Sequence, residues 1–106
     1  MAPPDPVHGA VITPHARFEI DRRGMSEDIV RSVLMRPEQS EEALPGRMIL
    51  QSRVSMGSPT RVYLVRVFVD VNRDPPEVVT AYRTSKLAKY WRVERCRWPT
   101  IRRPTP

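Results

Sequence analysis

Cysteine is almost absent from this chain, since Cys96 is the only one in 106 residues. An internal disulfide is therefore excluded, and neither this cysteine nor the two histidines, His8 and His15, have the spacing of a zinc site. Long apolar runs are also missing, because no uncharged stretch approaches the roughly 20 residues of a membrane helix. Residues 1–9 contain neither a basic leader nor an apolar segment. We therefore expect a soluble cytoplasmic protein that uses no metal and no other cofactor.

The chain is too short to divide into two stable cores, so we expect one domain. Hydrophobic residues form 40% of the sequence and follow helix and strand patterns in its middle part, unlike a disordered protein. We predict an irregular, proline-rich arm over residues 1–11, one α+β domain over residues 12–96, and a flexible basic tail over residues 97–106.

Positive charge is concentrated in the second half of the chain. Residues 1–45 carry five Arg and eight acidic residues, a net charge of −3, whereas residues 46–106 carry thirteen Arg or Lys and four acids, a net charge of +9. Clustered cations attract polyanions because binding releases counterions from phosphate. This asymmetry favours RNA, DNA or an acidic protein as the partner, although a cationic solubilising surface would have the same composition.

Two short helices are predicted before residue 38. Thr13 and Pro14 are favourable at the N-cap and the first position of a helix, and Gly24 stops that helix. Ser26 caps a second helix with an acidic first turn, and Pro37 ends it. The two helices form a hairpin.

After residue 38 the hydrophobic period changes to two. Residues 47–55 and 61–71 are rich in β-branched and aromatic side chains and predict a hairpin, and residues 77–83 predict a further strand. Residues 38–45 would add an edge strand, and residues 86–94 a last helix capped by the preceding Thr and Ser. The expected class is α+β: an N-terminal helical hairpin packed on a three- to four-stranded antiparallel sheet, with a C-terminal helix.

Several short motifs between residues 12 and 92 resemble a known family in their order and spacing. They are His15-Ala16, Arg23-Gly24-Met25-Ser26, Val78-Val79-Thr80-Ala81-Tyr82-Arg83-Thr84-Ser85-Lys86 and Lys89-Tyr90-Trp91. The pattern resembles the DUF4258 family, which is related to the BrnT and RelE/ParE-like toxins of bacterial toxin–antitoxin systems. The resemblance implies a RelE/ParE-like fold, RNA cleavage by attack of the 2′-hydroxyl on the adjacent phosphate, and an acidic antitoxin-like partner. Members often carry Arg four residues after the His, where this chain has Glu19.

Metal-free RNA cleavage requires a proton acceptor, cations that stabilise the phosphorane, and an acid for the leaving oxygen. His15 is the only histidine inside a predicted element and is the acid/base candidate, unless its ring only locks the helix to the sheet. Arg23, near the end of the first helix, would bind phosphate or complement the helix dipole. Tyr82 and Arg83, where the last strand passes into the final helix, complete the predicted catalytic set.

Further cations and hydroxyl groups are predicted to bind nucleic acid. They are Arg22, Arg61, Arg66, Thr84, Ser85, Lys86, Lys89 and Arg92. Arg66 lies on the opposite strand face from its valine neighbours, where it would grip phosphate or remain solvated. Thr84 and Ser85 would help a helix start to bind an anion, or would only cap it. Aromatic residues alternate with the last cations, as on RNA-binding surfaces, although Trp91 also fits a core position.

Two functions follow from these patterns. The first is a metal-independent endoribonuclease of the toxin type, neutralised by a partner that covers its basic groove. The alternative is a non-catalytic module of the same fold that binds nucleic acid or an acidic protein.

Overall fold

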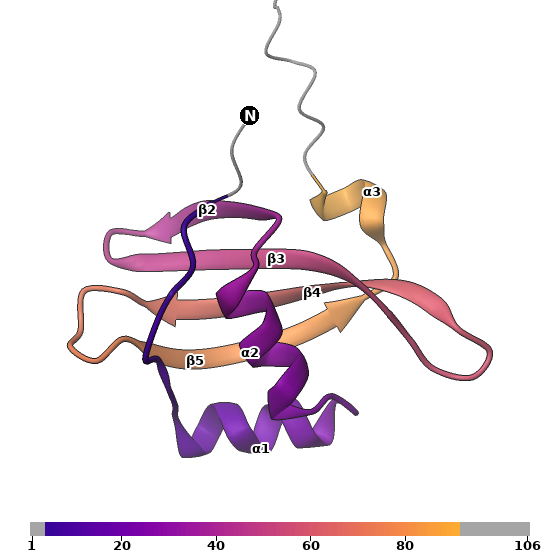
Figure 1. Ribbon diagram of the computed structural model, residues 1–106, viewed down its shortest axis with the longest axis horizontal. Helices are drawn as coiled ribbons and strands as arrows, with labels where there is room; N and C mark the ends of the chain where they lie inside the picture. The colour runs from indigo at the N-terminus through magenta and orange to yellow at the C-terminus, as the bar shows by residue number, and fades with distance from the viewer. Residues whose placement is uncertain (1–3, 92–106) are drawn as a thin grey trace, which may run out of the picture.

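The computed structural model describes residues 4–91, which form one mixed sheet and three helices (Figure 1). In chain order the elements are β1 (Val11–Ile12), α1 (Pro14–Arg22), α2 (Glu27–Met35), β2 (Gln39–Leu44), β3 (Arg47–Met56), β4 (Arg61–Asp70), β5 (Glu77–Thr84) and α3 (Leu87–Tyr90). The strand order is β1-β5-β4-β3-β2; β1 runs parallel to β5, and the other neighbours are antiparallel. Within residues 4–91, no helix has the length and apolar character needed to cross a membrane.

The hydrophobic core lies between the sheet and the first two helices. Alternation along β4 turns Val65, Val67 and Val69 toward the helices, and all three are fully buried. Figure 1 shows α2 crossing the sheet and α1 lying beside β5. The helices contribute Ala16, Ile20, Val30, Val33 and Leu34 to this core. The helical hairpin therefore covers one face of the sheet, and the other face is left for different side chains.

Polar caps fix both helices where the sequence predicts them. The Thr13 hydroxyl accepts from the Ala16 N–H at 3.1 Å and donates to the Val78 carbonyl at 3.0 Å, so it caps α1 and also attaches it to β5. The Ser26 hydroxyl accepts from the Ile29 N–H at 3.2 Å and caps α2. The start of each helix is confirmed.

The α+β class, the helical hairpin and the central strands are confirmed, but three details of the prediction were wrong. Val11 is paired in β1 instead of belonging to an irregular arm, so the sheet is mixed and has five strands. Thr84 and Ser85 do not cap α3, because Lys86 is its N-cap residue and makes no side-chain capping bond. The helix also begins one residue later than predicted, at Leu87. The predicted continuation over residues 92–96 and the tail lie outside the described residues.

The core predicts a contrast between two leucines. Leu34 is only 2% exposed, so Leu34→Ala is expected to lower the free energy of unfolding by about 2–5 kcal/mol through lost burial and a residual cavity. Leu44, at 58% exposed, is the matched control. Leu44→Ala is expected to change the free energy of unfolding by less than about 0.5 kcal/mol. Urea unfolding of both variants measures the difference, and similar losses would contradict this assignment of the core.

Candidate functional site

The sheet face turned away from α1 and α2, which we call the open face, carries a buried arginine. Arg66 is only 6% exposed. Its Nε donates to Gln51 Oε1 at 2.9 Å, its Nη1 donates to the Tyr82 hydroxyl at 2.6 Å, and its Nη2 lies 3.6 Å from Glu41 Oε2. The guanidinium is therefore enclosed by protein groups, which leave little of it accessible from solvent.

These partners form one row across the sheet. The register places Gln39 opposite Gln51, Gln51 opposite Arg66, and Arg66 opposite Tyr82. The Gln51 amide donates to Gln39 Oε1 at 2.7 Å while its oxygen accepts from Arg66, so both ends of this buried glutamine are bonded. Cross-strand pairing thus builds a continuous polar row across the open face.

The short helix α3 lays a second tyrosine over this row. The Tyr90 carbonyl accepts from Gln51 Nε2 at 3.2 Å, and Arg66 Cζ lies 4.4 Å from the centroid of the Tyr90 ring. The rings of Tyr82 and Tyr90 meet edge to face, with 6.3 Å between their centroids. A cation over an aromatic face is attracted by the electrons of the ring. Arg66 consequently holds both phenols in place.

The phenol of Tyr90 has its pKa lowered from the ordinary tyrosine value. The largest cause is a hydrogen bond from Lys89, followed among the lowering effects by one from the Tyr82 hydroxyl, and the positive charges of Lys89 and Arg66 act in the same direction while burial opposes them. Lys89 is exposed and Tyr90 is half-buried. The Tyr90 phenol therefore gives up its proton more readily than an ordinary tyrosine, at the border between protein and solvent.

A second stack fixes the end of α3 to β3. Arg53 Cζ lies 4.2 Å from the centroid of the Trp91 ring, and its Nε and Nη2 each lie 3.2 Å from the carboxylate of Glu38, to which they donate. This hydrogen bonding lowers the pKa of Glu38 and raises that of Arg53. Trp91 thus packs on a cation at the edge of the open face.

The predicted residues of α1 lie on the other side of the sheet. His15 is exposed in the first turn of α1, whereas Arg66 projects from the opposite sheet face, so the two do not converge as the sequence predicted. Glu19 accepts from Arg22 at 2.6 Å and pairs with Arg23 at 2.8 Å, and the bond from Arg22 lowers its pKa. Arg23 also donates to the Ala81 carbonyl at 2.8 Å. Glu19 therefore offsets one of these two charges.

Arg83 and Arg61 also belong to the helix side of the sheet. Arg83 Nη1 lies 3.2 Å from Met56 Sδ, and its Cζ lies 4.8 Å from the centroid of the Tyr63 ring. Arg61 pairs with Met56 across the hairpin and is exposed. Neither arginine forms an ion pair within the described part of the chain.

The structure thus divides the predicted site residues into three groups, of which only the first lies on the open face. Arg66, Tyr82 and Lys89 meet on the open face; His15, Arg22 and Arg23 lie on or at the end of α1; Arg61 and Arg83 lie on the helix side of the hairpin. The end of β5 and the start of α3 carry Thr84, half-buried, and Ser85 and Lys86, both exposed. Arg92 lies outside the described residues. The predicted site residues did not include Gln51, Arg53 or Tyr90, although Tyr90 belongs to the Lys89-Tyr90-Trp91 motif.

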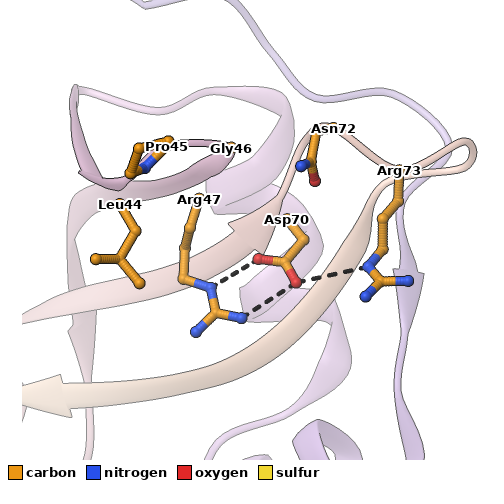
Figure 2. Close-up of a pocket in the computed structure, with 7 residues that line it drawn as sticks. All are labelled: Leu44, Pro45, Gly46, Arg47, Asp70, Asn72 and Arg73. Carbon is orange, nitrogen blue, oxygen red and sulfur yellow. Dashed lines mark hydrogen bonds and ion pairs between the residues drawn. The ribbon is translucent and has the colours of Figure 1, made fainter.

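A separate pocket of about 450 Å³ lies between the β2–β3 and β4–β5 turns (Figure 2). Arg47 donates to both carboxylate oxygens of Asp70, at 2.7 and 3.1 Å, and Arg73 lies 3.7 Å from the same carboxylate. The bond from Arg47 lowers the pKa of Asp70, and none of the predicted site residues lines this pocket. Among residues 4–91, no group of three His, Cys, Asp or Glu side chains is placed to hold a metal ion.

Comparisons with protein-family models, with curated proteins and with solved structures found no match for this chain. A function therefore has to be inferred from the side chains of the site.

Gln51 supports the site from within the sheet, which predicts a stability effect. Gln51→Leu leaves Arg66 Nε without its acceptor in a region closed to water, so the free energy of unfolding is expected to fall by about 1–3 kcal/mol. Ser55→Ala, at an exposed position of the same strand and face, is the control and should be nearly neutral. Equal stability of the two variants in urea unfolding would show that this bond does not hold Arg66.

The titration of Tyr90 provides a second prediction. Because hydrogen bonding and positive charge from Lys89 favour the phenolate, Lys89→Met is expected to raise the pKa of Tyr90 toward its ordinary value. Lys86→Met removes the same charge from a lysine that does not affect Tyr90 and should leave the pKa unchanged. NMR titration of the tyrosine ring carbons measures both. A Tyr90 pKa that is insensitive to Lys89 would contradict the described contact.

Proposed function

We propose that the protein is a metal-independent endoribonuclease that works in the cytoplasm and cleaves RNA at the open face. The observation that carries the proposal is the position of Tyr90, between the ammonium of Lys89 and the Arg66–Tyr82 pair. A phenol held between cations loses its proton more readily than an ordinary tyrosine, which suits it to exchange a proton with a substrate hydroxyl.

RNA is the substrate class that the charge of the chain favours. The segment that includes β3, β4, β5 and α3 belongs to the half of the sequence with a net charge of +9. Three aromatic side chains, Tyr82, Tyr90 and Trp91, accompany the cations on the open face and offer rings on which bases can stack. The resemblance of residues 12–92 to the DUF4258 family and its toxin relatives supports the same substrate.

The proposed reaction uses the 2′-hydroxyl of RNA as the nucleophile. The Tyr90 phenolate takes the proton of the 2′-hydroxyl, O2′ attacks the adjacent phosphorus, and the bond from phosphorus to the 5′-oxygen breaks. The Lys89 ammonium donates a proton to the leaving 5′-oxygen, which yields a 2′,3′-cyclic phosphate and a 5′-hydroxyl. The proton on Tyr90 then passes to the Lys89 amine and restores the starting state. Arg66 and Tyr82 hold Tyr90 and stabilise its charged form.

This assignment differs from the one that the sequence suggested, because His15 has no part in it. An acidic antitoxin-like protein remains the proposed cellular partner, since the net charge of +9 in residues 46–106 attracts acidic side chains as well as phosphate. A non-catalytic module that only binds RNA is the competing function, and the same experiment separates the two.

The test is cleavage of labelled single-stranded RNA in the presence of EDTA. Tyr90→Phe removes the hydroxyl but keeps the ring, so it is expected to slow cleavage by about 100-fold or more while RNA binding is retained. Tyr63→Phe makes the same change on the helix side and is the matched control. His15→Ala should leave the rate unchanged.

Each other outcome has a definite meaning. Loss of cleavage in His15→Ala but not in Tyr90→Phe would place the chemistry on α1 and reject the open-face site. RNA that is bound but remains intact with the wild-type protein would establish the non-catalytic function instead. RNA that is neither bound nor cleaved would reject both.

A further inference from the structure

Arg23 and Arg83 lie at the edge of β5 near the C-terminal end of α1, and Arg61 lies on the helix side of the neighbouring strand β4. Arg23 extends from the end of α1, and its Nη1 lies 2.8 Å from the Ala81 carbonyl and 3.3 Å from the Thr80 hydroxyl. Thr80 pairs with Phe68 on the open face, whereas Ala81 belongs to the core on the helix side. Arg23 therefore spans the edge of the sheet from one face to the other.

Arg83 lies next to this edge on the helix side. Its neighbours hold the side chain in place but do not neutralise its positive charge. Tyr63 stacks on the guanidinium, and Met56 Sδ accepts from its Nη1. Gly24, with φ +72°, lets the guanidinium approach the turn between α1 and α2, since a Cβ there would lie 3.3 Å from Arg83 Nη2. A sulfur atom and an aromatic ring are weak partners for an arginine, so the capacity of Arg83 to bind an anion is largely unused.

The surrounding charge is positive. Arg61 is exposed beside Met56 and has no ion pair within residues 4–91, and Arg22 and Arg23 share the single carboxylate of Glu19. Tyr82 precedes Arg83 in β5, and adjacent strand residues point to opposite faces, so the proposed reaction site and Arg83 are separated by the thickness of one strand.

We propose that Arg83 and Arg61, with Arg23 at the edge, form a second phosphate-binding site for an RNA strand that bends around β5 from the open face to the helix side. This site rests on the proposed RNA-binding function and extends it, because it predicts the path of the bound strand and a dependence on RNA length. A short RNA occupies only the open face, while a longer one also places its backbone phosphates against these arginines. Bidentate binding of phosphate by Arg83 would add affinity without taking part in the chemistry.

The test compares oligouridines of about four and about twelve nucleotides that carry 2′-O-methyl groups, which prevent cleavage by the 2′-oxygen. Arg83→Gln and Arg61→Gln are each expected to weaken binding of the longer oligomer several-fold and to leave binding of the shorter one unchanged. The slope of log affinity against log salt should fall by about 0.7 for each phosphate contact removed. Arg73→Gln, in the turn at the opposite end of β5, removes the same charge and is the control.

Arg61→Gln protects the test against misfolding, because this exposed side chain makes no polar contact that its loss would disrupt within the described residues. If both variants bind the longer oligomer as Arg73→Gln does, the second site is rejected while the open-face function stands. If the short and long oligomers both fail to bind to the wild-type protein, the underlying proposal of RNA binding is what fails. Equal weakening for both lengths would show general attraction by charge instead of a path around β5.

Discussion

The open face is organised around a positive charge to which water has little access. A buried guanidinium is stable only where acceptors and aromatic faces replace its hydration shell. Gln51 and Tyr82 provide the acceptors, and the ring of Tyr90 closes the remaining side. Since these partners come from β3, β5 and α3, the contacts of Arg66 connect these three elements to β4. This explains how a helix of four residues without a side-chain cap keeps a defined place on the sheet.

Alternation along β5 gives neighbouring residues different environments. Tyr82 belongs to the polar row on the open face, Ala81 is in the core, and Arg83 lies beside Tyr63 on the helix side. A strand of eight residues thereby supplies a tyrosine to the polar row, a core contact and a cation without a carboxylate partner among the described residues. Because successive side chains of a strand point to opposite faces, Tyr82 and Arg83 are neighbours in the chain but lie on opposite sides of the sheet.

Much of the fold could be predicted because local signals determine it. The Thr13 and Ser26 caps and the period of two in β3 and β4 all indicate structure that the molecule adopts. β1 could not be found in this way, since two residues have no measurable period and their pairing depends on strand residues 66 positions later. The candidate site was harder to predict, because residue type alone made His15 the acid/base candidate and could not show that Arg66 projects from the other face of the sheet. The register of the β3–β4 hairpin could have identified part of the site. A simple hairpin that turns after Gly57 places Gln51 opposite Arg66.

The two edges of the sheet differ in structure, and both affect whether strands of separate molecules can pair. Beside β5, the two-residue β1 and the side chain of Arg23 occupy backbone positions that another strand would need. At the other side, β2 carries Glu41 and Glu42 and has an irregular register before Leu44. Charged side chains at the edges and short or irregular outer strands discourage edge-to-edge pairing between molecules. The long apolar strands β3 and β4 stay in the interior of the sheet, where they are shielded from the intermolecular stacking that leads to fibrils.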